Sequence, residues 1–464
     1  MNKLKLTTLS NGIRIATFPL KTPLTTIALA SFAGSRYETT KELGIYRILE
    51  KMMLTKTKKR STEEREETIN RLGGYIDTKI SAEAFLMHGS VISNRSDLLI
   101  EIFQDSIQNL VHSQKEINSK IQQYIEKSKE TRLIGREIID DLVHAAAYAP
   151  KKLKILKANE YHFSNLGLAQ NSKSLLFSEK KLKSITSSKL KNAMKKVFYG
   201  ENMVFSNVGM DHDLFCKKID NAFGKMPKKP PQNLPQNRSS YKGGYINYPQ
   251  KIVDDQNTTV YIDGKLPLNA EMSYLGWFYP GADLFSDDIF AYFVLQFIIG
   301  DAASFSSGGP GKGMYSRSCR NIMSKHFFID SIEAKNFSYS DSGLFGIVAG
   351  LNSQFLENGC EIIHNEFLQL ANVPVPNQEL ERAKNRLKMM LFMILEEREV
   401  FAEDIVHQIL FYGYWMNPDY ICKKIDSVTQ KDILRISNNC LNSPLTLAAW
   451  GDTTSLKNYE KYLK

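Results

Sequence analysis

The sequence has few cysteines, and none of them stands in a CxxC pair. The five are odd in number and scattered over 464 residues, at Cys216, Cys319, Cys360, Cys422 and Cys440. This pattern predicts neither a disulfide framework nor a thiolate zinc site. A reducing interior compartment fits it best.

Long apolar runs are also lacking. The longest, from Ile289 to Gly300, contains a glutamine and falls short of the roughly 20 residues that a membrane-spanning helix needs. We expect a buried helix there and no transmembrane segment. No signal peptide is visible either, because residues 1–18 read as two strands around an Asn-Gly turn at Asn11 and Gly12. Any organelle address is therefore expected to be internal or already removed.

Common catalytic signatures are missing as well. The eight histidines include no HExxH motif and no pair at metal-ligand spacing. No serine stands in a GxSxG elbow. We expect each histidine to be a surface or core residue.

Clustered positive charge is absent, although the formal net charge is +10. The Lys and Arg residues are spread along the whole length and are not interleaved with aromatic residues, as a nucleic-acid interface would require. The pattern is typical of a solvated Lys- and Asn-rich surface. We expect no nucleic-acid partner.

What the sequence does contain is a proline-rich break near its middle. Residues 224–245 hold four prolines among Lys, Asn, Gln and Ser, so they offer little to bury and are predicted to form a linker. We expect one domain at 1–223 and a second at 246–464. Each of these stretches ends in an apolar strand followed by a glycine, in MVFSNVG and LTLAAWG, which suggests an internal duplication.

Secondary-structure patterns indicate the fold class. Residues 116–131 and 379–394 are predicted to form long helices, and short alternating strands lie between the helical patterns. Helices segregated from hairpin-forming strands predict an α+β architecture.

A candidate metal helix lies at residues 44–53, GIYRILEKMM. Its apolar residues fall at helical spacing and leave Arg47, Glu50 and Lys51 outside the apolar face. By pattern alone these three would form a solvated charged face. In its surroundings, however, the segment resembles the inverted zinc motif HxxEH of the insulinase-like metallopeptidase superfamily, in which two histidines hold zinc and the glutamate is the general base.

The resemblance puts Arg47 and Lys51 at the two histidine positions and Glu50 at the base position. A guanidinium offers no lone pair to a metal, and an ammonium offers one only after losing its proton, so zinc is not expected here. The resemblance also implies that the third ligand position, about 75 residues downstream, is Glu126. We hypothesise that ion pairs between the two cations and the carboxylates of Glu50 and Glu126 occupy the zinc volume.

A glycine-rich segment, SFSSGGPGKGMYSR at 304–317, follows the apolar helix. Four glycines in six residues allow backbone conformations with positive φ. The spacing matches neither GxxxxGK[ST] nor GxGxxG, so a phosphate-binding loop is excluded. An isolated glycine cluster is usually a flexible surface loop.

This segment, however, resembles the signature loop of the alpha-subunit family of mitochondrial processing peptidases. The resemblance extends from LSNGIRIAT at the start to WGDTTSLKNYE at the end. In that family the loop binds incoming presequences. The residues implied to bind substrate are Gly308, Gly309, Pro310, Gly311, Lys312, Gly313, Met314 and Tyr315.

The resemblance implies two homologous insulinase-like metallopeptidase-type domains, a duplicated α/β roll, joined by the proline-rich linker. It implies a non-catalytic recognition subunit without a catalytic site or metal of its own. A zinc-bearing catalytic beta subunit and presequence-bearing precursor proteins would be its partners. The expected compartment is the mitochondrial matrix or its equivalent in a hydrogenosome or mitosome. Two alternatives stay open: an active single-chain metallopeptidase, which requires HxxEH, and a structural core subunit of a respiratory cytochrome bc complex, which normally lacks the glycine loop.

Overall fold

The computed structural model describes residues 4–20, 22–39, 42–132, 134–148, 179–230, 234, 239–249, 272–304 and 314–463. The chain forms two compact units. Unit 1 consists of Met1–Glu126, Phe177–Asn237 and Leu391–Pro418, and unit 2 of Lys127–Leu176, Arg238–Met390 and Asp419–Lys464. Neither unit is continuous in sequence, because each half of the chain contributes a segment to the other unit. The boundaries expected at 1–223, 224–245 and 246–464 remain a prediction about the duplicated sequence.

The elements of unit 1 are β1 (Lys5–Thr8), β2 (Arg14–Phe18), β3 (Leu24–Phe32), α1 (Ile45–Met52), α2 (Thr62–Leu72), β4 (Tyr75–Ile80), β5 (Ala84–Ile92), α3 (Ser96–Gln108), α6 (Glu179–Lys183), α7 (Ser187–Val197), β6 (Met203–Val208), α8 (His212–Phe223) and α12 (Arg398–Tyr412). The expected hairpin around Asn11 and Gly12 is confirmed, since β1 and β2 pair antiparallel from Lys5 opposite Thr17 to Thr8 opposite Arg14.

The elements of unit 2 are α5 (Gly135–Tyr148), β7 (Gly244–Pro249), β8 (Met272–Gly281), α9 (Ile289–Ile299), β9 (Asp301–Ala303), β10 (Ile329–Ser338), β11 (Gly343–Asn352), α10 (Leu356–Asn372), α14 (Gln430–Leu441) and β12 (Thr446–Gly451). Three helices have residues in both units: α4 (Gln114–Arg132), α11 (Asn377–Glu396) and α13 (Pro418–Asp426). Within the described ranges, no helix is long and apolar enough to cross a membrane.

The two sheets share one plan. Among the described residues their strand orders are β1-β2-β6-β3-β5-β4 and β7-β12-β8-β11-β10-β9. In each sheet a parallel pair, β2 with β6 or β7 with β12, adjoins the central antiparallel strands β3 and β5, or β8 and β11. The expected α+β class is confirmed, and the repeated topology agrees with an internal duplication.

The duplication fixes which residues correspond. Strands β5 and β11 end at Ile92 and Asn352, are followed by the 3-10 turns η2 (Ser93–Arg95) and η7 (Ser353–Phe355), and continue as α3 and α10. In this region each residue of the first half therefore corresponds to the residue 260 positions later. The glycines at the ends of the two halves also correspond. Gly209 has φ of 112° and Gly451 has φ of 105°, a conformation that favours glycine.

The sheet of unit 2 is buried on two faces, and the side chains of its strands alternate between them. Leu275 and Trp277 pack with α9, α10 and α14, whereas Tyr274 and Phe278 pack with α5. The apolar run predicted as a buried helix is α9, which lies within the first of these cores, so that prediction is confirmed.

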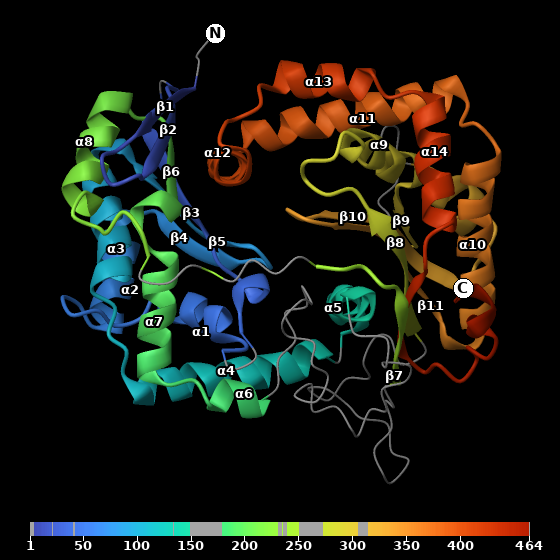
Figure 1. The fold of residues 1–464 in the computed structure, drawn as a ribbon, viewed down its shortest axis with the longest axis horizontal. Helices are drawn as coiled ribbons and strands as arrows, with labels where there is room; N and C mark the ends of the chain where they lie inside the picture. Colours follow the sequence, from blue (N-terminus) through green and yellow to red (C-terminus); the bar gives the residue numbers. More distant parts are fainter. Residues whose placement is uncertain are drawn as a thin grey trace. The chain divides into compact units, whose positions relative to one another are not determined.

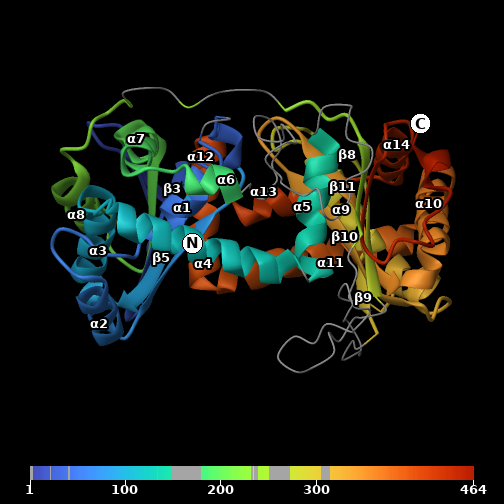
Figure 2. The same cartoon turned by 90° about the horizontal axis from the view of Figure 1, so that it is seen from below.

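The helix on the opposite face of each sheet comes from the other half of the chain. Helix α12 packs on β3 and β6 of unit 1, and α5 packs on β8 and β12 of unit 2. Figure 1 shows this exchange by colour, with orange-red α12 beside blue strands and blue-green α5 beside yellow-green strands. In both views α3 and α8 lie on the other face of the first sheet from α12 (Figures 1 and 2).

An ion pair accompanies each exchange. Lys79 on β4 pairs with Glu403 on α12 at 2.9 Å, and Lys335 on β10 pairs with Asp140 on α5 at 2.6 Å. The two lysines occupy equivalent positions in the two sheets. Lys79 lies opposite Leu86 and Lys335 lies opposite Gly346, and Gly346 is the residue 260 positions after Leu86.

Candidate functional site

Helix α1 carries the candidate metal positions. The apolar residues expected on its buried face, including Ile48, Leu49 and Met52, are at most 1% exposed. Glu50 is also buried, with a relative exposure of 4%, so it does not belong to a solvated charged face. A buried carboxylate requires compensation by opposite charge or hydrogen bonds.

Arg47 and Lys51 supply that compensation from the same helix. The guanidinium Nη1 of Arg47 lies 3.5 Å from Oε2 of Glu50, and the ammonium of Lys51 donates to Oε1 at 2.9 Å. Both carboxylate oxygens therefore face a cation. These residues do not fit zinc, because the two histidine positions hold groups that donate hydrogens and offer no lone pair. Among the residues that the structure describes, no group of three or more His, Cys, Asp or Glu could hold a metal ion.

The hypothesis that Glu126 forms ion pairs with Arg47 and Lys51 is wrong. Its side chain is exposed on α4 and accepts a hydrogen bond from Gln122 at 2.8 Å, instead of pairing with Arg47 or Lys51. Among the residues of this helix whose burial is described, Ile117, Ile121 and Ile125 are the buried ones. Glu126 follows Ile125 directly and lies about 100° further around the helix, which turns it away from the buried face.

Sequence reasoning missed Glu38. This carboxylate is 3% exposed and accepts the backbone N–H groups of Gly44 at 2.8 Å and Tyr46 at 3.1 Å. It therefore caps the start of α1, where Gly44 has φ of 79°. Burial raises the pKa of Glu38 to about 7. An acid six residues before the N-cap residue of a helix has no distinctive sequence spacing, so only the fold reveals this role.

The glycine-rich segment is described only at its two ends. The expected binding residues Gly308, Gly309, Pro310, Gly311, Lys312 and Gly313 lie outside the described residues, whereas Met314 and Tyr315 are described and exposed. Before the gap, Ser304 donates to Asp330 O at 2.8 Å. After it, Tyr315 O accepts from Arg382 Nη2 at 2.7 Å.

Arg317 fixes the chain immediately after this segment. It is 8% exposed and donates to both carboxylate oxygens of Glu379, at 2.8 and 3.2 Å, and to Glu366 at 3.2 Å. Burial works to lower the pKa of Arg317, but hydrogen bonds and charge from Glu379 and Glu366 outweigh it and raise the pKa. Bidentate pairing of this kind has a well-defined geometry, so Arg317 is a fixed base at the end of the glycine-rich segment.

Two cavities adjoin this base within unit 2. The smaller, of about 250 Å³, is lined by Tyr315, Arg317, Arg320, Asn321, Gln369, Val373, Pro374, Pro376 and Glu379. The larger, of about 560 Å³, is lined by Asn321, Ile322, Lys325, His326, Phe328, Asn358, Glu361, Ile362, Asn365, Glu366 and Gln369. Asn321 and Gln369 line both, so the two cavities are neighbours along α10.

Comparison with known proteins places these features in a family context. Residues 15–159 match the family model described as insulinase (peptidase family M16), and residues 184–387 match the model described as the peptidase M16 inactive domain. Similar proteins include the mitochondrial-processing peptidase subunits alpha of Solanum tuberosum, Caenorhabditis elegans and Homo sapiens. The identities are 27%, 28% and 26%. The alignments cover 98% to 99% of this chain and 84%, 86% and 83% of the relatives.

Proposed function

Because the chain belongs to the insulinase family of peptidases, family M16, we propose that it is a non-catalytic, substrate-recognising subunit of a mitochondrial-type processing peptidase. The observation that carries this proposal is the double ion pair on α1. Arg47 and Lys51 stand where the family's zinc motif has its histidines, and both point a cation at Glu50. Because the two cations do not bind zinc, Glu50 has no metal-bound water to activate as a general base.

Two observations support assignment to the alpha type. The relatives named alpha subunits match along nearly the whole chain, and the segment GGPGKGMYSR at 308–317 resembles the alpha-type glycine loop. A structural core subunit of a cytochrome bc complex is the competing assignment. It agrees equally well with the lost zinc ligands, but it gives no reason for the glycine loop.

The proposal implies a division of labour. A second subunit, of the beta type, would hold the zinc and carry out peptide hydrolysis, while this chain binds precursor proteins by their N-terminal presequences. The compartment would be the mitochondrial matrix or its equivalent in a mitochondrion-related organelle. Presequences are amphipathic, rich in arginine and poor in acidic residues, so they must be recognised in many variants.

The chemistry of a glycine-rich segment suits that task. Such a backbone offers main-chain donors and acceptors to an extended peptide without contacts to particular side chains. The residues on either side of it are held by hydrogen bonds, Ser304 to Asp330 and Arg317 to Glu379. Lys312 itself would not attract a basic presequence, so the loop's contribution is expected to come from its backbone.

The test is the affinity of an arginine-bearing model presequence for the complex of this chain with its catalytic partner, measured by fluorescence anisotropy. Deleting 308–313 should weaken binding about tenfold or more. The complex should still assemble, because glycine has no side chain to bury and its ordering costs much entropy. Lys312→Ala is the matched control and should change affinity much less. Equal affinity for the deletion and the wild type would place recognition elsewhere.

A further inference from the structure

Helix α11 carries large apolar side chains on an exposed face near its end. Met389, Phe392 and Met393 are 47%, 48% and 52% exposed. Phe392 and Met393 follow Met389 by three and four positions, so the three side chains lie on one face of the helix. A single exposed apolar residue is ordinary, but a contiguous group of large ones marks a contact surface.

The duplicated fold does not require apolar residues at this place. In the equivalent helix of the first half, α4, the buried residues include Ile117 and Ile121. The residues 263 positions later, Leu380 and Lys384, are buried on α11. With this correspondence, the counterpart of the first methionine of the exposed group is Glu126, which is itself exposed. A polar residue therefore serves the fold in the first half, and the apolar group on α11 needs another explanation.

The side chains of this group suit a partner of variable sequence. Methionine is unbranched and polarisable, so it adapts its shape to different neighbours and is common at surfaces that bind many sequences. The ring of Phe392 adds a large, rigid contact area between the two methionines. Such a surface can cover apolar side chains without requiring a particular one.

Two exposed carboxylates follow the apolar group. Glu396, the last residue of α11, lies one turn beyond Phe392 and Met393, and Glu397 comes next. Neither forms an ion pair within the described part of the chain, not even with Arg398 at the start of α12. The four bases of α11 contact other acceptors: Lys384 pairs with Glu381 at 2.9 Å, Arg386 with Asp301 at 3.8 Å and Lys388 with Asp426 at 2.7 Å, and Arg382 donates to Tyr315 O at 2.7 Å.

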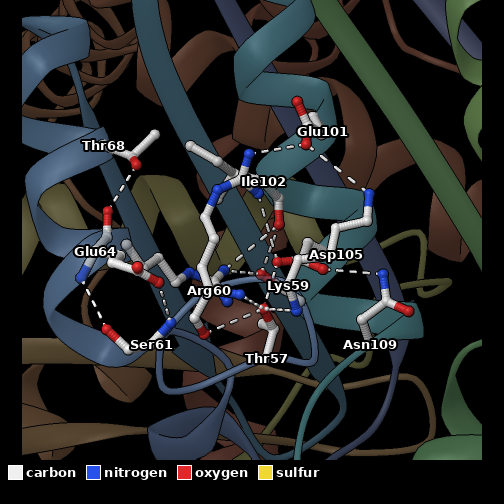
Figure 3. Close-up of polar contacts among 12 residues, drawn as sticks. Thr57, Lys59, Arg60, Ser61, Glu64, Thr68, Glu101, Ile102, Asp105 and Asn109 are labelled. Atoms are coloured by element: carbon white, nitrogen blue, oxygen red, sulfur yellow. Dashed lines mark hydrogen bonds and ion pairs between the residues drawn. The ribbon is translucent and has the colours of Figure 1, made fainter.

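On α3, by contrast, the chain supplies bases to an exposed carboxylate. Figure 3 shows Glu101 beside Arg60 and Lys59, which lie 2.8 and 3.8 Å from its Oε1 atom. The side chain of Glu101 is 40% exposed, so exposure alone does not leave a carboxylate without a base. The uncompensated negative charge beside the apolar group of α11 therefore complements a basic ligand.

We propose that the α11 stripe, formed by Met389, Phe392, Met393 and Glu396, binds an amphipathic segment of the polypeptide substrate. The apolar face of the segment covers the methionines and the phenylalanine, and an arginine pairs with Glu396. The stripe is about 10 Å long, or two helical turns, which matches the i, i+3, i+4 and i+7 repeat of an amphipathic peptide helix.

The inference rests on the proposed function, which supplies an amphipathic, arginine-bearing polypeptide as the substrate. It adds side-chain contacts to the main-chain contacts expected of the glycine-rich segment. The same stripe would repel an acidic ligand through Glu396. A second copy of this chain or the catalytic partner is the competing occupant, and the experiments below distinguish both from the substrate.

The first experiment measures affinity of the arginine-bearing model presequence for the complex with the catalytic partner. Combining Met389→Ser with Met393→Ser should weaken binding about threefold to tenfold, because the bound peptide then covers less apolar area. The matched control is Leu214→Ser on α8, since Leu214 is 48% exposed, and it should have little effect.

The charge of the stripe is tested in the same assay. Glu396→Lys should weaken binding about threefold to tenfold, because it removes one attraction and adds a repulsion. Glu460→Lys makes the same change in net charge at another exposed carboxylate without an ion pair among the described residues. It should leave the affinity nearly unchanged.

A pair of peptides separates direct contact from an indirect effect. Replacing the apolar residues of the presequence by serine should weaken binding to the wild type. Binding to the double methionine variant should weaken clearly less, because that contact is already missing. A photoreactive p-benzoylphenylalanine in place of Phe392 should crosslink to the presequence, and the same group in place of Phe285, which is 59% exposed, should not.

Three outcomes would overturn the inference. If the double methionine variant binds the peptide as Leu214→Ser does while deletion of 308–313 still weakens binding, the α11 stripe is not a substrate contact, although the proposed function stands. If the variant no longer assembles with the catalytic partner, or loses self-association that the wild type shows, the stripe is a subunit contact. If the wild-type complex does not bind the peptide, the proposed function and this inference both fail.

Discussion

Arg65 and Arg317 donate hydrogen bonds to residues at equivalent positions of two equivalent helices, α3 and α10. Arg65 donates to the hydroxyl of Ser106 on α3, and Arg317 donates to Glu366 on α10 at 3.2 Å, 260 positions later. Both guanidiniums are buried, and both belong to the segment that connects an apolar helix, α1 or α9, to the next long strand. The duplicated fold thus uses one buried arginine in each half to attach this connection.

Replacing Arg65 should strongly destabilise unit 1. Its guanidinium also donates to Thr55 O at 3.2 Å and Ile102 O at 3.4 Å, and burial lowers its pKa to about 10. Arg65→Ala would leave buried carbonyls unpaired and a cavity behind, so the free energy of unfolding should fall by roughly 3–5 kcal/mol. Urea denaturation measures this change. Arg71→Ala, on the exposed side of the same helix, should stay within about 0.5 kcal/mol; equal effects would contradict the role of Arg65.

Glu38 should make stability depend on pH. Its pKa is about 7 in the folded protein, against an ordinary value of 4.5. Its contribution to stability is therefore complete below about pH 4.5 and is lost as the pH rises to 7, because the unfolded chain releases this proton first. Relative to Glu38→Gln, the wild type should lose up to about 3 kcal/mol of unfolding free energy between these pH values. Chemical denaturation at pH 5 and pH 8 measures the difference.

The matched control for that series is Glu66→Gln, since Glu66 is exposed on α2. A pH dependence no larger for Glu38→Gln than for this control would show that the Glu38 carboxyl ionises in the folded protein as it does in the unfolded chain.

The exchange of α5 and α12 predicts that the two halves fold only together. Cut between residues 230 and 239, the first half would expose Leu142 and Val143 of α5, and the second would expose Ile405 and Ile409 of α12, all at most 1% exposed in the intact protein. We expect each half alone to aggregate or bind a hydrophobic dye, and the co-expressed halves to co-purify one to one. Two soluble, independently folded halves would contradict this prediction.

Local patterns of the sequence predicted the elements well. The hairpin at Asn11 and Gly12, the buried helix α9 and the strand-glycine ends at Gly209 and Gly451 all follow from short-range spacing. The two cations around Glu50 also lie where the motif resemblance put them, because all three residues share one helix.

Relationships between distant residues could not be read in this way. The pairing of Lys79 with Glu403 spans more than 300 residues, and no periodicity in the sequence indicates that α12 covers the sheet of the opposite half. Glu126 was misplaced because a residue count fixes position along a helix without fixing the face. Arg65 and Arg317 look like ordinary solvated charges until the fold buries them.

The central claim is that this chain recognises substrate while a partner holds the zinc, and native mass spectrometry of the tagged, natively purified protein tests it most directly. The account predicts one copy of this chain with one copy of an HxxEH-bearing chain and one zinc ion, and no zinc on this chain after the two are separated. A monomer or homodimer, or zinc retained by the separated chain, would contradict the account.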